Sequence, residues 1–268
     1  MLYLSQDQAL SEALEAYDNA EQRLESQNLD KATFLEPVHQ AKARLLYHHI
    51  IENRVYKPSQ VRDELYKSIL LFPRNTIFLS LFGFNEARFR IENRVRSLLT
   101  RQVLEPAGSG RSIEKQATLI PHLFLVYSEL HRGVSAGSTA HSVRAAFESA
   151  VSSQPGRHSA GLWKLFVQFE LTLGETEKGR QVFFRSIRAC PWSKQLVLLA
   201  FTEPSLRKSM RFGDLRKVFN VFVEKELRVH VDLEEWLEEN EAHIRPHDSS
   251  VELKPLITMP DDRSSDED

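Results

Sequence analysis

The sequence has little cysteine, glycine and proline, and it contains no long hydrophobic run. A single cysteine, Cys190, excludes a disulfide framework and a zinc site built from several thiolates. Ten glycines and eleven prolines in 268 residues are too few for a turn-rich β-sandwich or β-barrel. Because no run of about 18 apolar residues occurs, we expect neither a membrane-spanning helix nor a membrane partner.

The net charge is also small, at −2, but the charges are unevenly distributed. Residues 1–36 hold eight acids and two bases, and residues 232–268 hold 13 acids and three bases. Residues 37–231 hold 16 acids and 30 bases. A basic middle section of this kind indicates an anionic or acidic partner. The alternative is that the acidic ends neutralise it, or that its charges are solvated helix faces.

Hydrophobic residues recur with the period of an α-helix along most of the chain. Leu10, Leu14, Tyr17 and Leu24 lie on one helical face, and proline and glycine separate such segments. No alternating run bounded by turn residues supports a strand. The sequence therefore predicts an all-α protein of about ten helices. The later helices are expected at 61–72, 77–104, 119–130, 142–152, 162–173, 179–189, 196–201 and 215–236.

Two stretches repeat at an offset of 36 residues, VRAAFESAVSSQP (143–155) and GRQVFFRSIRACP (179–191). At this offset, an Arg, a Phe and a Pro of the first stretch match the same residue types in the second. A further step of 36 residues again finds an Arg and a Phe. The matched residues are Arg144, Phe147 and Pro155; Arg180, Phe183 and Pro191; and Arg216 and Phe219. A further copy, VRDELYKSILLFP, lies at 61–73.

An aromatic helix precedes these copies. It carries Trp163, Phe166, Phe169 and Glu170 in its clearest form, and weaker versions end in Glu86 and Glu129. Two helices in about 36 residues form a hairpin that cannot bury its apolar face alone. The pattern therefore predicts an α-solenoid of stacked antiparallel helical hairpins.

This pattern resembles the half-a-tetratricopeptide (HAT) repeat, in which the first helix carries Trp and aromatic-Glu and the second carries Arg, Phe and a terminal Pro. The resemblance implies a HAT-like solenoid over residues 1–245, with the best-defined repeats at 143–227. A disordered acidic tail is expected over 246–268. HAT arrays occur in RNA-processing proteins as scaffolds. A generic tetratricopeptide-like adaptor without a link to RNA is the alternative.

Three further segments, at 82–99, 183–201 and 223–235, resemble the C-terminal part of the "necessary for RNA interference" (nuclear RNAi-defective) family. The resemblance implies a nuclear scaffold in gene silencing, splicing and RNA surveillance, with the exosome-associated RNA helicase among its partners. In that family the helicase-binding segment lies upstream of the HAT array. We expect this segment to be absent here, which weakens an assignment of helicase binding to this chain.

Two basic clusters are candidate surfaces for a protein partner or for RNA. The first is Arg88, Arg94, Arg96 and Arg101 in the expected long helix, and the second is Arg188, Trp192 and Lys194. The alternative for the first cluster is internal ion pairing, from Glu86 to Arg90 and from Glu92 to Arg96. The alternative for Trp192 is that it fills a seam between hairpins.

No catalytic constellation is expected. Gly133 to Gly137 matches G-x-S-x-G around Ser135, but a nucleophile elbow needs a preceding strand. We interpret this stretch as an interhelical loop. The adjacent His48 and His49 point to different helix faces and do not suit one metal ion. Cys190 is interpreted as a small buried hydrophobe. The sequence therefore predicts a non-enzymatic protein without a cofactor or metal.

Overall fold

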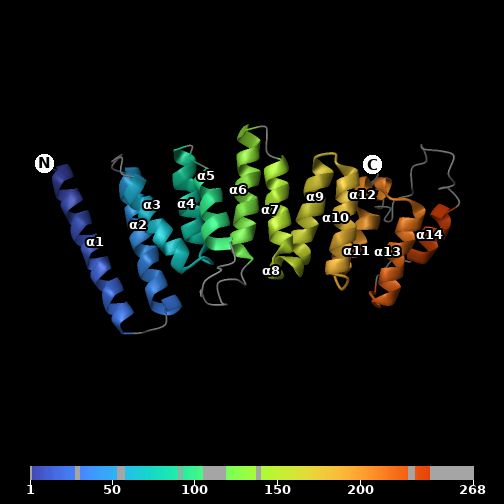
Figure 1. The fold of residues 1–268 in the computed structure, drawn as a ribbon, viewed down its shortest axis with the longest axis horizontal. Helices are drawn as coiled ribbons and strands as arrows, with labels where there is room; N and C mark the ends of the chain where they lie inside the picture. Colours follow the sequence, from blue (N-terminus) through green and yellow to red (C-terminus); the bar gives the residue numbers. More distant parts are fainter. Residues whose placement is uncertain are drawn as a thin grey trace, which may run out of the picture. The chain divides into compact units, whose positions relative to one another are not determined.

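The structure, a computed structural model, describes residues 2–27, 31–52, 58–89, 91, 93–104, 119–136, 140–228 and 233–241. These residues form helices and contain no strand, which confirms the predicted all-α fold (Figure 1). Within them, no helix combines the length and the hydropathy that crossing a membrane requires. The chain divides into two compact units, an N-terminal unit (Met1–Pro155) and a C-terminal unit (Gly156–Asp268).

The N-terminal unit consists of helices joined mostly by short connections. They are α1 (Leu2–Ser26), η1 (Lys31–Leu35), α2 (Glu36–Glu52), α3 (Pro58–Leu71), α4 (Thr76–Arg88), α5 (Asn93–Leu98), η2 (Leu99–Leu104), α6 (Ile120–Ala136) and α7 (Ala140–Ser152). Asn75 begins α4, because its side-chain oxygen accepts hydrogen bonds from the backbone N–H groups of Ile77 and Phe78. Its amide nitrogen donates to Glu36 Oε1 at 2.6 Å, which ties this turn to α2.

Successive helices of this unit pack as hairpins in a row. Helix α2 contacts α3, α3 contacts α4, and α6 contacts α7, while the first helices α2, α4 and α6 also contact one another in order. This packing is typical of a helical-repeat solenoid. The second helices bury equivalent residues, since Val61, Val95 and Val143 are each at most 5% exposed. Each hairpin therefore buries its apolar face on its neighbours.

The expected single helix over 77–104 is wrong. It is divided into α4, which ends at Arg88, α5, which begins at Asn93, and η2. Ile91 N–H reaches the carbonyl of Glu86, five residues back, and Arg94 N–H then bonds to Ile91. These bonds change the direction of the chain, because they depart from the i to i−4 pattern of an α-helix. The break makes α4 and α5 the two arms of a hairpin.

The interhelical loop expected around Ser135 is also wrong, since residues 133–136 lie in the last turns of α6. Gly137 lies outside the described residues. A helix at this position lacks the strand-to-helix turn that a nucleophile elbow requires. The match to G-x-S-x-G therefore has no supporting structural context.

The C-terminal unit begins in the short helix α8 (Gln154–Arg157). It continues with α9 (Ala160–Thr172), α10 (Thr176–Ala189), α11 (Lys194–Thr202), α12 (Pro204–Ser209), α13 (Phe212–Glu224) and α14 (Leu233–Glu241). Gly174 ends α9 with a φ of +76°, and the N–H groups of Gly174 and Glu175 bond to the carbonyls of Leu171 and Glu170. This is a Schellman motif, and it explains why glycine stands at this turn.

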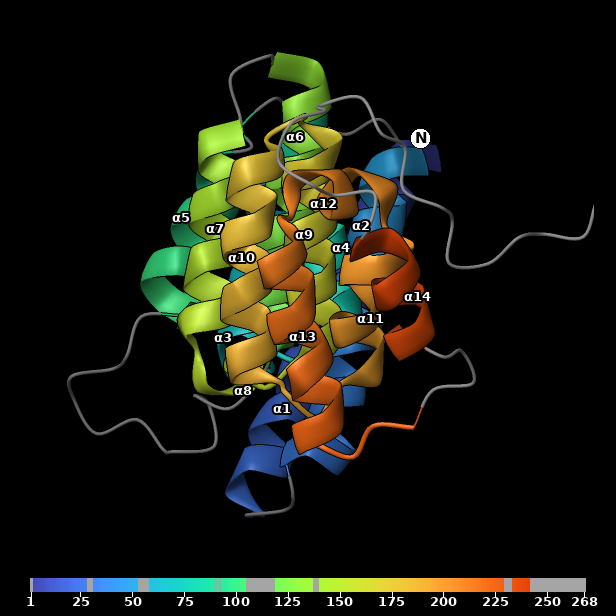
Figure 2. The same ribbon diagram turned by 90° about the vertical axis from the view of Figure 1, so that its right-hand side faces the viewer.

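Helices α9 and α10 pair as the hairpin that the repeat predicted, and α11 and α13 pack next to them (Figure 2). Phe166 and Phe183 are fully buried, and Trp163 is 3% exposed with its indole N–H donating to the carbonyl of Arg157. Cys190 is buried as expected, and burial raises the pKa of its thiol. Trp163, Phe166 and Phe183 thus belong to the core of this unit.

The prediction of one helix over 215–236 is also wrong, because this segment, like 77–104, is divided into separate helices. Helix α13 ends at Glu224, and Glu226 has a φ of +51°, which an α-helix does not accommodate. Helix α14 begins at Leu233. The predicted tail, 246–268, lies outside the described residues, and one continuous domain over 1–245 stays a prediction.

Candidate functional site

A buried carboxylate, Glu86, organises the centre of the N-terminal unit. Its side chain is 0% exposed, and Arg62 of α3 donates from Nε to Glu86 Oε1 at 2.7 Å. Asn85 Nδ2 donates to the same oxygen at 3.1 Å, and Arg94 Nη1 lies 3.8 Å from Glu86 Oε2. The expected partner Arg90 lies outside the described residues. Glu86 therefore joins the hairpin of α3 to the following hairpin.

Glu129 repeats this arrangement one hairpin later. It is 3% exposed on α6, and both of its oxygens accept hydrogen bonds from Arg96, one of them from Nε at 2.6 Å. This bidentate bond raises the pKa of Arg96. Glu92, the partner expected for Arg96, lies outside the described residues. Arg96 is thus engaged within the unit.

The repeat itself held a signal for these pairs. Val61-Arg62, Val95-Arg96 and Val143-Arg144 place the same dipeptide at the start of successive second helices. In the first two, the valine is buried and the arginine binds a glutamate of the next hairpin. Reading the dipeptide alone would have marked Arg96 as a repeat residue.

The remaining arginines of the first predicted cluster do not form one ridge. Arg88 is the last residue of α4, Arg94 lies in α5, and Arg101 lies in η2. Arg88 and Arg101 are exposed, and the side chain of Arg94 is 49% exposed. The break after α4 separates Arg88 from Arg94 and Arg101.

A largely apolar groove of about 370 Å³ runs between α4 and α6. Its floor on α4 is a stripe of small residues, and a Cβ added at Gly83 would lie 3.2 Å from Phe124 Cζ. Phe84 and Tyr127 line it and are 64% and 59% exposed. The other lining residues are Thr76, Ser80, Ala87, Val95, Ser128, Glu129, His131 and Arg132.

The groove is also lined by polar and charged side chains. His131 and Arg132 line it, and Arg88 follows Ala87 of its floor along α4. The carboxylate in its lining is Glu129, which is already bound by Arg96. An apolar side chain next to an acidic group would complement this surface.

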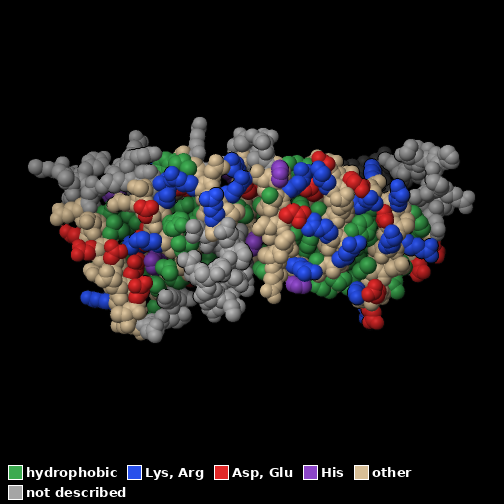
Figure 3. All heavy atoms as spheres, viewed as in Figure 1, with side chains coloured by type: hydrophobic (Ala, Val, Ile, Leu, Met, Phe, Trp, Pro, Cys, Tyr) green, Lys and Arg blue, Asp and Glu red, His purple; other side chains and the backbone are tan. Residues whose placement is uncertain are grey.

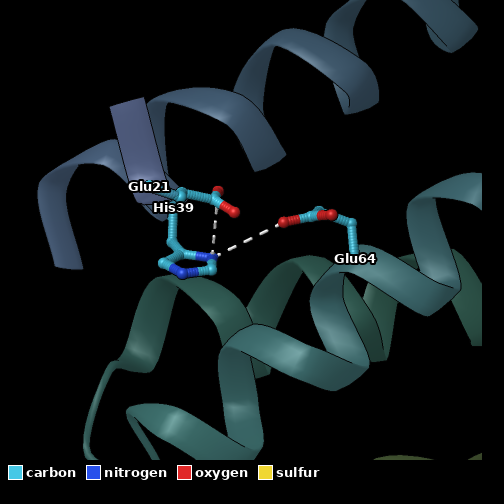
Figure 4. A group of neighbouring side chains, drawn as sticks. All are labelled: Glu21, His39 and Glu64. Carbon is cyan, nitrogen blue, oxygen red and sulfur yellow. Dashed lines mark ion pairs between the residues drawn. The ribbon is translucent and has the colours of Figure 1, made fainter. Parts of the chain in front are cut away.

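A polar cluster that the sequence did not predict joins α1, α2 and α3 (Figure 4). His39 is 4% exposed, and its Nδ1 lies 3.6 Å from Glu21 Oε1 and 3.5 Å from Glu64 Oε1. Ser68 Oγ lies 3.3 Å from the same nitrogen. Ligand atoms of Glu21, His39 and Glu64 lie within 4.8 Å of one another, the spacing that one metal ion could bridge.

The ammonium group of Lys42 balances the carboxylates of this cluster. Its ammonium lies 2.6 Å from Asp18, 3.2 Å from Glu21 and 3.1 Å from Glu64. Burial alone would lower the pKa of Lys42, but these carboxylates raise it above its usual value. Burial would raise the pKa of Glu64, but hydrogen bonds from His39 and Lys42 lower it. Since an ammonium already balances the carboxylates, we interpret the cluster as a structural ion network.

The second predicted cluster lies in the C-terminal unit, but its members are distributed differently from the prediction. Arg188 lines a groove of about 420 Å³ between α10 and α13. Trp192 lies in the turn after α10 and is 59% exposed, which contradicts the alternative that it fills a seam. Lys194 begins α11. The groove brings Arg188 together with other basic residues that the sequence did not predict as a surface.

Basic side chains dominate the α10–α13 groove, and Figure 3 shows lysines and arginines gathered over this part of the chain. Asp214 is its one lining carboxylate among the described residues. Its two oxygens lie 2.9 Å from Arg180 and 3.5 Å from Lys217. The lining residues are Arg180, Gln181, Phe184, Arg185, Arg188, Asp214 and Lys217.

The repeat residues that line neither groove differ in how deeply they are buried. Phe147 and Glu170 are each 1% exposed, whereas Arg216 is exposed and Phe219 is half-buried on α13. Leu215, Val218 and Phe222 are the buried positions of this helix. The 36-residue offset therefore locates α13, but its core positions differ from those of α10.

Comparisons with known proteins give a consistent result. No family model matches the chain. The chain is 29% identical over 209 residues to the mouse protein named nuclear exosome regulator NRDE2, which covers 75% of this chain and 17% of that protein. The human protein of the same name is 27% identical over 189 residues, covering 68% and 16%. The Dictyostelium discoideum protein is 25% identical over 174 residues, covering 65% and 13%.

The aligned part of the chain spans less than a fifth of each of these relatives. The similarity supports the resemblance to the nuclear RNAi-defective family, while the HAT assignment stays a prediction. Over most of its length, this all-α chain is therefore similar to a part of nuclear exosome regulator NRDE2.

Proposed function

We propose that the chain is a non-catalytic scaffold in nuclear RNA processing and surveillance, which acts with the nuclear exosome by binding partner proteins on its helical surface. The observation that carries this proposal is the similarity to the nuclear exosome regulator NRDE2 of three organisms. An array of hairpins presents extended surfaces for binding, which supports a scaffold. The nuclear location and the roles in RNA interference and splicing belong to the same proposal.

The α4–α6 groove is the surface that we assign to a partner protein. Its exposed aromatic residues, Phe84 and Tyr127, are the type of side chain that dominates binding energy at protein interfaces. Its basic margin favours acidic residues in the partner. The occupant that fits is a peptide segment of a partner protein that carries a bulky apolar side chain beside acidic residues.

Affinity purification of this chain from nuclear extract, beside a full-length relative, tests the proposal. The expected result is that both baits recover RNA-processing proteins, and that Phe84→Ala with Tyr127→Ala reduces recovery by the short chain at least fivefold. Leu165→Ala, at a site 51% exposed in the C-terminal unit, is the matched control and should have no effect. Recovery of the exosome-associated helicase by both baits would assign helicase binding to the array.

Three outcomes would contradict parts of the proposal. Recovery of the helicase by the longer bait alone would place its binding outside this chain. Partners without any link to RNA would favour a generic tetratricopeptide-like adaptor. Labelling of Ser135 by a serine-reactive probe would argue against a non-catalytic protein.

A further inference from the structure

The α10–α13 groove is lined by more cations than carboxylates. Four basic side chains line it against Asp214, which Arg180 and Lys217 already contact. Arg188 is exposed, and within the described residues no carboxylate forms an ion pair with it. The surrounding segment 156–228 holds 14 basic and seven acidic residues. The electrostatic interaction of a bound anion with this groove would therefore be favourable.

The basic residues are held on one face of α10. Arg180, Phe184 and Arg188 follow one another at intervals of four, so they form a row along the helix. The guanidinium of Arg185 lies over the ring of Trp163, 5.5 Å from its centroid. A cation–π contact of this kind fixes the side chain while its charge remains in place. The groove thus presents positioned cations.

Phe184 adds an apolar wall to this row of cations. It is half-buried, lines the groove, and packs edge-on against the buried Phe183 with 5.6 Å between the ring centroids. Basic residues alternating with an aromatic ring are the combination that binds single-stranded nucleic acid, since phosphates meet the cations and bases stack on the ring. A base within a duplex could not stack in this way.

We propose that the α10–α13 groove binds single-stranded RNA, with phosphates at Arg185, Arg188 and Lys217 and a base on Phe184. An acidic protein is disfavoured, because the groove offers one apolar side chain where a protein interface requires an apolar centre. Contact with RNA goes beyond the proposed binding of partner proteins. Either can fail without the other, because RNA affinity is measured on the purified chain alone.

The test is fluorescence anisotropy of the full chain with a fluorescein-labelled oligouridine. Binding should weaken with salt at a slope near −2 on logarithmic axes, from about three phosphate contacts at roughly 0.7 each. The variant Arg185→Glu/Arg188→Glu should bind at least tenfold more weakly. Lys208→Glu/Lys225→Glu makes the same change of charge at exposed residues outside the groove, and it should lose less than threefold.

A second variant separates stacking from charge. Phe184→Leu keeps an apolar side chain but removes the ring, so affinity should fall about fivefold while the salt slope stays the same. Equal losses in the two charge-reversed variants would overturn the proposal, because binding would then follow net charge alone. An absence of binding at low salt would also overturn it. Displacement of the RNA by an equal concentration of a polyglutamate peptide of matched charge would assign the groove to acidic proteins.

Discussion

The two units of the chain use arginine in opposite ways. In the N-terminal unit, Arg62 and Arg96 are directed inward to glutamates that are 0% and 3% exposed. In the C-terminal unit, Arg180 pairs with carboxylates that keep more solvent contact, and Arg188 remains on the surface. The same residue type therefore joins hairpins in one unit and creates a basic groove in the other. The partner carboxylates of Arg62 and Arg96 are buried, whereas those of Arg180 are 61% and 16% exposed.

Breaking one ion pair in each unit tests this difference, and it should give the largest effect. Arg62→Ala removes the nearest cation from the buried carboxylate of Glu86, so the free energy of unfolding of the N-terminal unit should fall by about 3 kcal/mol. Asp214→Asn breaks a pair whose carboxylate is 16% exposed, and it should cost the C-terminal unit about 1 kcal/mol. Urea unfolding measured for each unit would check both values.

The sequence supplies a separate optical probe for each unit. All three tryptophans, Trp163, Trp192 and Trp236, belong to the C-terminal unit, and all six tyrosines belong to the N-terminal unit. Tryptophan fluorescence and tyrosine absorbance can therefore follow the two units in one sample. Lys67→Ala, at an exposed site on α3, is the control for Arg62→Ala. Equal losses in Arg62→Ala and Asp214→Asn would remove the distinction between the units.

Acid should also separate the units, with an intermediate effect. Burial lowers the pKa of His122 from its ordinary 6.5, and the pKa of Glu64 lies below its ordinary 4.5. Both groups bind protons more readily in the unfolded chain. The stability of the N-terminal unit should thus decrease as the pH falls below about 6.5, and again below about 4.5. Both residues belong to this unit, so its tyrosine signal should respond to acid first.

A variant identifies the source of the lower step. Glu64→Gln removes the carboxylate that faces His39 and Lys42, so the loss of stability below pH 4.5 should become smaller while the step near pH 6.5 persists. The measurement is the urea midpoint at each pH from 7 to 4. An acid response that begins in the tryptophan signal would contradict this assignment.

Two helical glycines provide the smallest effect, and its sign should differ between the units. A Cβ at Gly83 would lie 3.2 Å from the end of the Phe124 ring, which lines the open α4–α6 groove and has space to shift. Gly83→Ala should therefore stabilise the protein by about 0.5 kcal/mol through helix propensity. Gly179 is buried, and a Cβ added there would lie 2.9 Å from Leu171 Cδ2. Gly179→Ala should therefore destabilise the protein by about 1 kcal/mol. Thermal unfolding of the two variants gives the signs.

Much of the fold followed from local patterns, because helical periodicity and proline or glycine stops act within a few residues. The hairpin of α9 and α10 is the clearest case, with its aromatic core and its glycine-terminated helix. The break after α4 was missed because Phe89, Arg90, Ile91 and Glu92 contain neither proline nor glycine. There the change of direction coincides with the buried Glu86, whose carbonyl Ile91 binds.

The candidate surfaces were less predictable, because they depend on contacts between distant residues. Arg62 and Glu86 are 24 positions apart, and Arg96 and Glu129 are 33 apart, which no helical spacing indicates. Gly83, Phe84 and Tyr127 meet in a groove only after two hairpins have packed. Arg188 was a candidate from the sequence, but Arg180, Phe184 and Arg185 joined it through the exposed face of α10.

The direction of the buried pairs has a consequence for how the chain folds during its synthesis. In both pairs the arginine precedes its glutamate, since Arg62 is made before Glu86 and Arg96 before Glu129. The side chains of Arg62 and Arg96 are 21% and 38% exposed. Each can therefore stay hydrated until the next hairpin has been made. In each of these two pairs, the arginine is therefore already present when its glutamate becomes buried. Growth of the chain from the N-terminus to the C-terminus thus never buries either glutamate before its arginine has been made.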